Sequence, residues 1–202
     1  LHIAANDTLC RHYLLPFFRK WETNESEIGL HITNRPSPDC VDLVLVKDVQ
    51  LAIVNDYEGL RQNPQLEVTP LAAVQDIFVG GANYKGAGFF NQGQLLSEPM
   101  LLLQQGTASR SLFDSVTHGA CRKPRFELGS IDVLMDMVEI NMGIAMLPEN
   151  VVAGKLQEGS IVKIETDIPI PKRDIVLVRS RLLPQSEGAA RFSALLTGAE
   201  EI

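Results

Sequence analysis

The chain opens with a change in its pattern of apolar and polar positions. An apolar run at residues 1–5 leads into a polar turn at residues 6–8. Leu14, Phe18 and Trp21 then recur at i, i+4 and i+7, which is the spacing of one face of an α-helix. The first segment is therefore predicted to form a strand, a polar turn and an amphipathic helix.

The same order of strand, turn and helix recurs along the chain. Apolar runs that predict strands lie at 28–33, 51–54, 100–103, 125–128 and 144–147, and helical patterns lie at 41–47, 112–116 and 131–138. This alternation is typical of βαβ units, in which helices cover both faces of a mainly parallel sheet.

The remaining segments predict how the repeated units are joined. Residues 66–80 and 174–179 are extended runs, and a last helix is expected at 187–196. Because this tail is too short for a third lobe, we assign it to the first, so that the chain crosses between lobes twice.

The predicted fold class is therefore α/β. It comprises two Rossmann-like lobes with mixed, mainly parallel sheets, joined by two crossover strands. Lobe I would comprise residues 1–76 plus 176–202, and lobe II residues 77–175.

Two residues are expected to shape particular helices. Pro16 falls inside the first helical pattern, where it predicts the first full turn or a kink. Gly143 follows the helix at 131–138 and is expected to end it as a left-handed C-terminal residue.

Charge and cysteine content narrow the functional classes. The 202 residues carry a formal net charge of −7, so we expect no general attraction to DNA phosphates. Cys10, Cys40 and Cys121 are odd in number and widely spaced, which fits a reducing cytoplasm and thiols without chemistry. We find no run of about 18 apolar residues and expect no membrane association.

Polar turns at the carboxyl ends of the predicted strands are the candidate binding elements. Open parallel sheets bind ligands there, where helix N-termini present unpaired N–H groups. The four turns are Asn6-Asp7-Thr8, Pro36-Ser37, Gly106-Thr107-Ala108-Ser109 and Gly129-Ser130. If the lobes face each other, these turns would converge on one small polar or anionic molecule.

A simpler interpretation remains open for each turn alone. Ser, Thr, Asn and Asp at a helix start are common N-caps. Asp7 and Asp132 near these starts would repel an anion, whereas Arg11, Arg35 and Arg110 would offset that repulsion. Only the convergence of four turns favours a ligand.

The sequence offers little support for catalysis. The four histidines, His2, His12, His31 and His118, are scattered without the spacing of a metal site. No nucleophile elbow or P-loop is present, and Gly86-Ala87-Gly88 lacks the third glycine of a dinucleotide fingerprint. We expect no enzyme activity, no metal and no cofactor.

Several motifs together resemble the effector domain of LysR-type transcriptional regulators. The opening residues 3–9 with Leu14-Leu15-Pro16, and the strands at 30–33 and 51–54, follow that family's order. The most specific match is residues 138–148, which is similar to the signature V-x-x-G-x-G-I-A-x-L-P. Two positions depart from the family pattern: Gln50 replaces an acidic residue, and Asn141 replaces the first glycine of the signature.

The resemblance implies a type 2 periplasmic-binding-protein fold that holds an effector in the inter-lobe cleft. It also implies a homodimer or homotetramer, and an N-terminal winged helix-turn-helix outside this chain that binds DNA. By position in the family pattern, the effector-binding residues would be Asn6, Thr8, Pro36, Ser37, Gly106, Thr107, Ser109, Ser130 and Met146.

Two other functions share this architecture. One is a free-standing solute-binding protein of an ABC transporter, which would be exported. The other is a lobed enzyme that closes on its substrate; the sequence shows no recognisable acid, base, nucleophile or metal set for it.

Overall fold

The computed structural model describes residues 1–25 and 27–199, which form two compact units. Unit 1 contains Leu1–Ala73 and the C-terminal segment that begins at Arg173, and unit 2 is Val74–Lys172. The chain therefore passes from unit 1 to unit 2 and back again. The predicted α/β class with mixed sheets is confirmed.

Unit 1 is built on a five-stranded sheet with the order β2-β1-β3-β12-β4. The strands are β1 (His2–Ala5), β2 (His31–Asn34), β3 (Leu51–Asn55), β4 (Leu66–Val74) and β12 (Arg173–Ser180). Strand β1 is parallel to both of its neighbours, β2 and β3, whereas β12 is antiparallel to β3. The late strand β12 therefore completes the sheet that the first residues begin.

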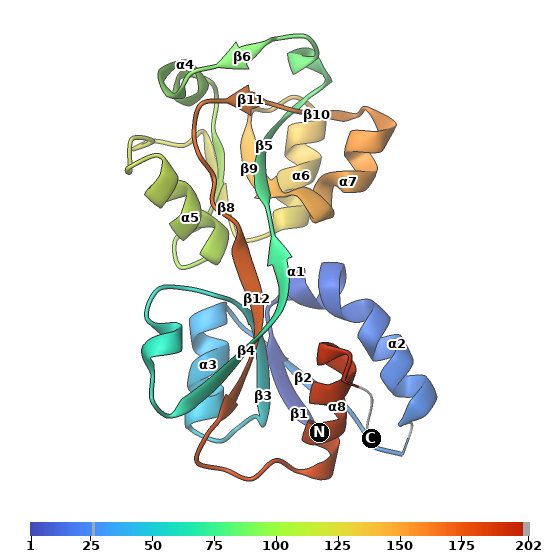
Figure 1. Ribbon diagram of the computed structural model, residues 1–202. Helices are drawn as coiled ribbons and strands as arrows, with labels where there is room; N and C mark the ends of the chain where they lie inside the picture. Colours follow the sequence, from blue (N-terminus) through green and yellow to red (C-terminus); the bar gives the residue numbers. More distant parts are fainter. Residues whose placement is uncertain (26, 200–202) are drawn as a thin grey trace. The chain divides into compact units, whose positions relative to one another are not determined.

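Helices cover both faces of this sheet (Figure 1). Helix α3 (Ser37–Leu45) packs Val41 and Val44 against one face. On the other face, α2 (Leu15–Asn24) meets α8 (Glu187–Thr197), where the ring of Trp21 lies edge-on to that of Phe192 at 5.2 Å between centroids. The C-terminal helix is thus fixed to unit 1 by the first helical region.

The first helical region is not one regular helix. It comprises α1 (Asp7–Leu9), the π-helix η1 (Cys10–Leu14) and then α2, in which Pro16 lies in the first turn. Proline has no N–H to donate to the preceding turn, and the helical run changes from the π-turn η1 to α2 directly before it. The prediction that Pro16 marks a first turn is confirmed.

Unit 2 has three short sheets, and an isolated bridge connects the two larger ones, β10-β5-β9 and β7-β8. The strands are β5 (Asp76–Gly81), β7 (Leu101–Leu103), β8 (Phe126–Leu128), β9 (Ala145–Pro148) and β10 (Ile161–Lys163). Strand β5 lies antiparallel between β10 and β9, and β7 is parallel to β8. A parallel bridge between Met100 and Ile144 joins the two sheets, which gives the continuous order β8-β7-β9-β5-β10.

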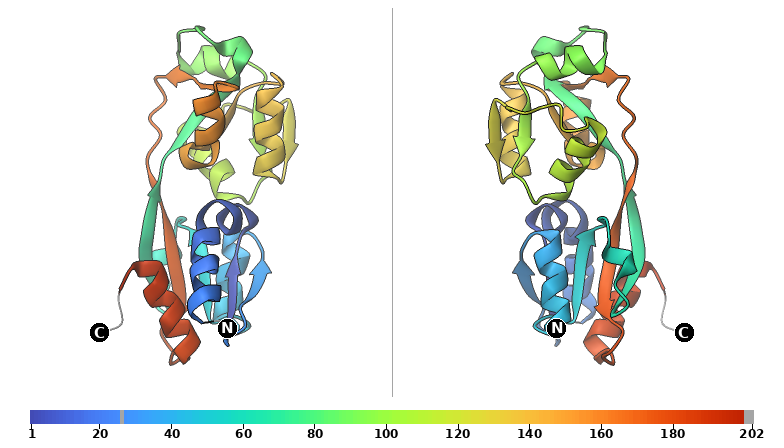
Figure 2. Two further views of the ribbon diagram at one scale, coloured as in Figure 1. Left: turned by 90° about the vertical axis from the view of Figure 1, so that its right-hand side faces the viewer. Right: turned by 90° about the vertical axis from the view of Figure 1, so that its left-hand side faces the viewer.

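Unit 2 also has an apolar core on each face of its strands. Helices α6 (Ile131–Glu139) and α7 (Glu149–Glu158) cover one face, where they lie side by side (Figure 2). Helices α4 (Gln92–Ser97) and α5 (Ala108–Val116) cover the other. The smaller elements of the chain are β6 (Phe89–Phe90), β11 (Glu165–Thr166) and the 3₁₀ turns η2 (Leu60–Gln62) and η3 (Ala82–Tyr84). No described helix is long and apolar enough to cross a membrane.

The prediction that Gly143 ends the helix as a left-handed residue is wrong. Helix α6 ends at Glu139, and the left-handed residue after it is Asn141, with φ of 63°. Asn141 also accepts a hydrogen bond from the Asn83 N–H at 2.8 Å. Gly143 is needed for space, because a Cβ there would lie 2.1 Å from the Pro99 carbonyl oxygen. Asparagine tolerates the left-handed conformation better than most residues, which explains how it replaces a glycine at position 141.

Candidate functional site

In unit 1 the two predicted turns lie next to each other at the strand ends. Asn6 caps α1, its Oδ1 accepting from the Leu9 N–H at 2.8 Å, and its Nδ2 lies 3.5 Å from Ser37 Oγ. Ser37 Oγ also accepts from the Asn55 N–H at 3.3 Å. The hydroxyl of Ser37, only 4% exposed, therefore connects the ends of β1 and β3.

The other predicted residues of unit 1 surround this contact. Thr8 lies in α1 and is half-buried, whereas Pro36 precedes α3 and is exposed. Asn55 is a buried polar residue that sequence analysis missed, and its Oδ1 accepts from Arg173 Nη1. A polar residue that ends a fully buried strand was the signal that could have identified Asn55.

The thiols near these turns are protonated at neutral pH. Burial, with a smaller contribution from Asp7, raises the pKa of Cys10 to about 11. Burial likewise raises the pKa of Cys40 to about 11, and its Sγ–H donates to the Arg35 carbonyl at 3.1 Å. Because the thiolate is the reactive form, neither cysteine is suited to act as a nucleophile.

In unit 2 the predicted turns are again neighbours. Gly106 adopts φ of 85°, and Thr107 caps α5 by accepting from the Arg110 N–H at 3.2 Å. Ser130 caps α6 by accepting from the Val133 N–H at 3.4 Å. The Gln104 N–H donates to the Leu128 carbonyl at 3.0 Å, which holds the two turns together at the ends of β7 and β8.

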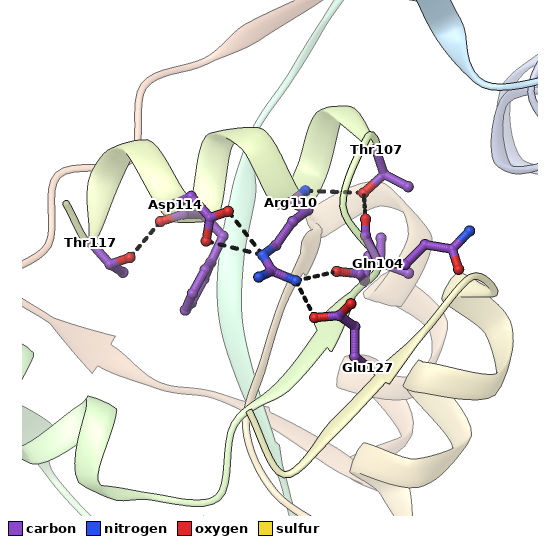
Figure 3. A network of polar contacts seen from close by, with 8 residues as sticks. Gln104, Thr107, Arg110, Asp114, Thr117 and Glu127 are labelled. Carbon is purple, nitrogen blue, oxygen red and sulfur yellow. Dashed lines mark hydrogen bonds and ion pairs between the residues drawn. The ribbon is translucent and has the colours of Figure 1, made fainter. Parts of the chain in front are cut away.

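A charged network lies directly behind these turns (Figure 3). Arg110 Nε lies 3.0 Å from both carboxylate oxygens of Asp114. Its Nη1 donates to the Leu103 carbonyl at 3.0 Å and to Glu127 Oε2 at 2.7 Å. The Arg110 network, defined as Arg110, Asp114, Glu127 and the Leu103 carbonyl, ties α5 to β7 and β8.

The Arg110 network contains one positive charge and two negative charges. Burial lowers the pKa of Arg110, but its hydrogen bonds to Glu127 and Asp114 outweigh that effect and the pKa is raised overall. The guanidinium therefore stays charged and faces two carboxylates. Arg110, which sequence analysis considered as an offset to nearby acids, is thus held by two acids of its own.

Ser109 and Met146 meet at a small cavity inside unit 2. The cavity measures about 10 Å³, and its lining consists of Leu101, Leu102, Leu103, Ser109, Arg110, Phe113 and Met146. Its volume suits about one water molecule or one ligand group of that size. The structure thus brings together two predicted site residues, Ser109 from helix α5 and Met146 from strand β9.

The histidines are not all isolated in space. His2 and His31 occupy paired positions on β1 and β2, and their rings stack with centroids 4.7 Å apart. Within the described part of the chain, no group of three or more His, Cys, Asp or Glu could hold a metal ion. The stacked pair therefore contributes a packing contact at the start of the sheet.

The fold and the site together define a two-unit α/β ligand-binding domain, in which each unit presents polar turns at the ends of its parallel strands. The chain belongs to the LysR substrate binding domain family, whose model matches residues 1–200. The resemblance to LysR-type regulators drawn from the sequence motifs is confirmed. A search of curated proteins found no match.

Solved structures of regulatory domains show the same fold. The apo regulatory domain of HypT from Salmonella typhimurium is 18% identical with a TM-score of 0.82, covering 98% of this chain and 93% of that chain. The regulatory domain of Synechocystis PCC6803 CcmR in complex with 2-PG is 15% identical with a TM-score of 0.83, covering 98% and 95%. The effector binding domain of QuiR in complex with shikimate is 15% identical with a TM-score of 0.77, covering 98% and 95%.

Proposed function

We propose that this chain is the effector sensor of a transcriptional regulator, and that it binds a small polar or anionic metabolite without turning it over. The observation that carries the proposal is the pairing of polar turns in each unit of a chain that belongs to the LysR substrate binding domain family. The effector binding domain of QuiR has been solved in complex with shikimate, and the regulatory domain of CcmR in complex with 2-PG.

We assign the binding role to the turn residues of both units. Unit 1 would supply Asn6, Thr8, Pro36 and Ser37, and unit 2 would supply Gly106, Thr107, Ser109, Ser130 and Met146. N-capping leaves other first-turn N–H groups of each helix available to a ligand. One effector that contacts both sets of turns would stabilise one arrangement of the units over another. Such a shift requires that the effector bind the two arrangements with different affinity.

The regulator would act in the cytoplasm as a homodimer or homotetramer, and would contact DNA only through a separate N-terminal domain. One edge strand in each unit carries an exposed apolar residue, Ile32 on β2 at 41% and Phe126 on β8 at 38%. Exposed edges with apolar side chains favour contact with another chain. These edges support self-association of the domain.

The family match favours this function over a solute-binding protein of an ABC transporter. An enzyme is the remaining alternative, and it would require that a bound compound be converted. Product analysis after prolonged incubation with any binding compound separates the two, because a sensor releases its effector unchanged.

A thermal-shift screen of the chain against small polar metabolites tests the proposed function. A compound that binds the native state raises the melting temperature with the logarithm of its concentration. Thr8→Ala and Ser130→Ala, one change in each unit, should both weaken that shift. Thr197→Ala is the matched control, since Thr197 lies on α8 and bonds only to its own helix.

The link to transcription is tested with the full-length regulator. The compound identified in the screen should change the affinity of the regulator for its promoter, as measured by fluorescence anisotropy at fixed salt. A compound that binds the chain but leaves promoter binding, promoter bending and transcription unchanged would contradict the regulatory role.

A further inference from the structure

A groove lies beside the edge strand β10 of unit 2, at the opposite edge of the sheet from the turns that follow β7 and β8. The β10 groove, defined as residues 84–89 and 162–165, has a volume of about 570 Å³. Small-molecule sites in proteins have volumes of this order. The two segments are joined where β6 pairs with β11. The groove is therefore separate from the turns to which the proposed function assigns the effector.

One wall of the β10 groove is fixed by packing. The Tyr84 ring lies on the bare backbone of β5, since a Cβ at Gly80 would lie 2.6 Å from Tyr84 Cδ2. The Tyr84 hydroxyl donates to Glu98 at 2.8 Å, so this side chain offers a ligand its ring and not its hydroxyl. Ile164, which is 4% exposed, is held by its N–H, which donates to the Phe78 carbonyl at 2.8 Å. A wall that is already ordered reduces the cost of binding.

The β10 groove also exposes apolar surface. Phe89 is 63% exposed, which is unusual for so large an apolar side chain, and it lies opposite Glu165 in the pairing of β6 with β11. Ala87 and Val162 add further apolar surface. A ligand with an apolar body would remove this surface from water.

The charges of the β10 groove favour a single negative charge on that ligand. Lys163 Nζ lies 3.5 Å from Glu165 Oε1, and both side chains are exposed. Among the described residues, the Lys85 side chain has no ion-pair or hydrogen-bond partner. The groove thus contains two cations and one anion, whereas the whole chain has a net charge of −7. A monoanion balances this local charge, and a dianion would leave an excess of negative charge beside Glu165.

Two backbone donors in the groove are also available. No described residue accepts a hydrogen bond from the N–H of Gly86 or Gly88. A Cβ at either glycine would meet no atom within 4 Å, so there is space around both. A carboxylate accepts hydrogen bonds from backbone N–H groups and from ammonium groups alike.

We propose that the β10 groove binds a small monocarboxylate with an apolar body. Lys85 and Lys163 pair with the carboxylate, and the body packs between Phe89 and the Tyr84 ring. This is a second ligand site of the chain, additional to the effector site assigned under the proposed function.

The test compares phenylacetate with phenylacetamide, an uncharged molecule of nearly the same shape. Each is titrated into the chain while the backbone N–H signals are followed by two-dimensional NMR. Phenylacetate should shift the Gly86 and Gly88 signals saturably, and phenylacetamide should bind about fivefold more weakly. The signals of Gly106 and Ser130, which report on the turns, should not follow the same titration curve.

Charge and apolar contact are tested separately with variants of exposed residues. Lys85→Gln and Lys163→Gln should each weaken phenylacetate binding about threefold, and the double variant about tenfold, because each removes one exposed cation. Phe89→Ala should weaken the binding of both probes about threefold through lost apolar contact. Lys123→Gln is the matched control for charge, since Lys123 is exposed and precedes β8 at the other edge of the sheet.

Three results would overturn the inference. Phenylacetamide that binds as tightly as phenylacetate would show that the groove does not recognise charge. A loss of affinity as large in Lys123→Gln as in Lys85→Gln would show general attraction of an anion. Gly86 and Gly88 signals that ignore both probes but change with protein concentration would mean that a second copy of the chain covers the groove. All three leave the proposed function intact, because that function depends on a metabolite whose binding is weakened by Thr8→Ala and Ser130→Ala.

Discussion

The two units build the same sheet from different parts of the chain. In unit 1 the order is β2-β1-β3-β12-β4, and in unit 2 it is β8-β7-β9-β5-β10. In both, three parallel strands are followed by one antiparallel strand, which is β12 in unit 1 and β5 in unit 2. The strand order and the strand directions are therefore common to both units.

The units differ in the group that ties their strand ends together. In unit 1 the Ser37 hydroxyl, at the start of α3, joins the ends of β1 and β3. In unit 2 the Arg110 guanidinium, in the first turns of α5, joins β7 and β8 and brings two carboxylates with it. The same structural task is carried out by a neutral group in one unit and by an ion network in the other.

The units also differ just before their third parallel strand. Gln50 precedes β3 in unit 1, and its side chain donates to Ser186 Oγ at 2.9 Å. Gly143 lies at the corresponding point before β9 in unit 2, where the Pro99 carbonyl leaves no space for a side chain. The glycine is thus required by close packing in unit 2 alone.

Gly143→Ala should have the largest effect on stability. Its Cβ would lie 2.1 Å from the Pro99 carbonyl oxygen and 3.2 Å from Leu101 Cγ, so strands β7 and β9 must separate. We expect a loss of about 3 kcal/mol in the free energy of unfolding. Urea unfolding monitored by circular dichroism measures this change.

Gly154→Ala is the matched control for that substitution. Gly154 lies inside α7, and a Cβ there meets no atom within 4 Å. Replacing a helical glycine should stabilise the protein by about 0.5 to 1 kcal/mol. Equal effects at positions 143 and 154 would contradict the packing explanation for Gly143.

Arg110→Met should have the next largest effect. The substitution keeps an apolar stem of similar length but removes every hydrogen bond of the guanidinium, and it leaves the Leu103 carbonyl without this donor. We expect a loss of about 2 kcal/mol in the free energy of unfolding. Glu127→Gln should cost less than about 1 kcal/mol, because Glu127 is 42% exposed. If Arg110→Met unfolds at the same urea concentration as the wild type, the network does not stabilise unit 2.

Ser37→Ala tests the neutral counterpart in unit 1. The change removes the acceptor of the Asn55 N–H, which lies on a buried residue. We expect a loss of about 1 kcal/mol in the free energy of unfolding. Ser97→Ala, at an exposed helix end, should have almost no effect on the same measurement. A larger loss for Ser37→Ala than for Arg110→Met would contradict the expectation that the Arg110 network stabilises its unit more than the Ser37 hydroxyl does.

Much of the fold could be predicted because its central strands are short continuous apolar runs. Residues 51–54 and 144–147 are fully buried on both faces, so their strands were evident without periodicity. Helix α7 was not predicted, since Gly154 interrupts it and only Val152 among its residues is buried. Strand β2 begins at His31 and not at Ile28, because Ile28 is in a turn whose carbonyl accepts from Trp21 Nε1.

The site was harder to predict than the fold. N-caps such as Thr107 and Ser130 depend on neighbours within three residues, so the local sequence indicates them. The contact between Arg110 and Glu127 depends on which strand lies beside β7, and the stack of His2 on His31 depends on the register between β1 and β2. Such pairings are set by tertiary structure, which spacing along one chain does not reveal.

The smallest effect is expected at the ion pair that joins α6 and α7, where the cation Lys155 is 24% exposed, whereas the cation of the Arg110 network is only 8% exposed. Lys155 Nζ donates to Glu139 and lies 3.3 Å from Asp136 Oδ1. The hydrogen bond from Lys155 lowers the pKa of Glu139 below its ordinary value of 4.5. A lowered carboxyl pKa contributes stability above the ordinary value, and that stability is lost as pH falls through the folded pKa.

Glu139→Gln should therefore lower the urea midpoint slightly at pH 7, and the decrease should shrink as the pH falls below 4.5 through the lowered pKa of Glu139. The decrease at pH 7 should disappear when Lys155→Gln is already present, because Glu139 then has no positively charged partner whose attraction could be lost. High salt should reduce it as well, since both side chains are partly accessible to solvent. A decrease that stays equally large as the pH is lowered from 7 to well below 4.5 would mean that Glu139 acts through packing of its side chain and not through its charge.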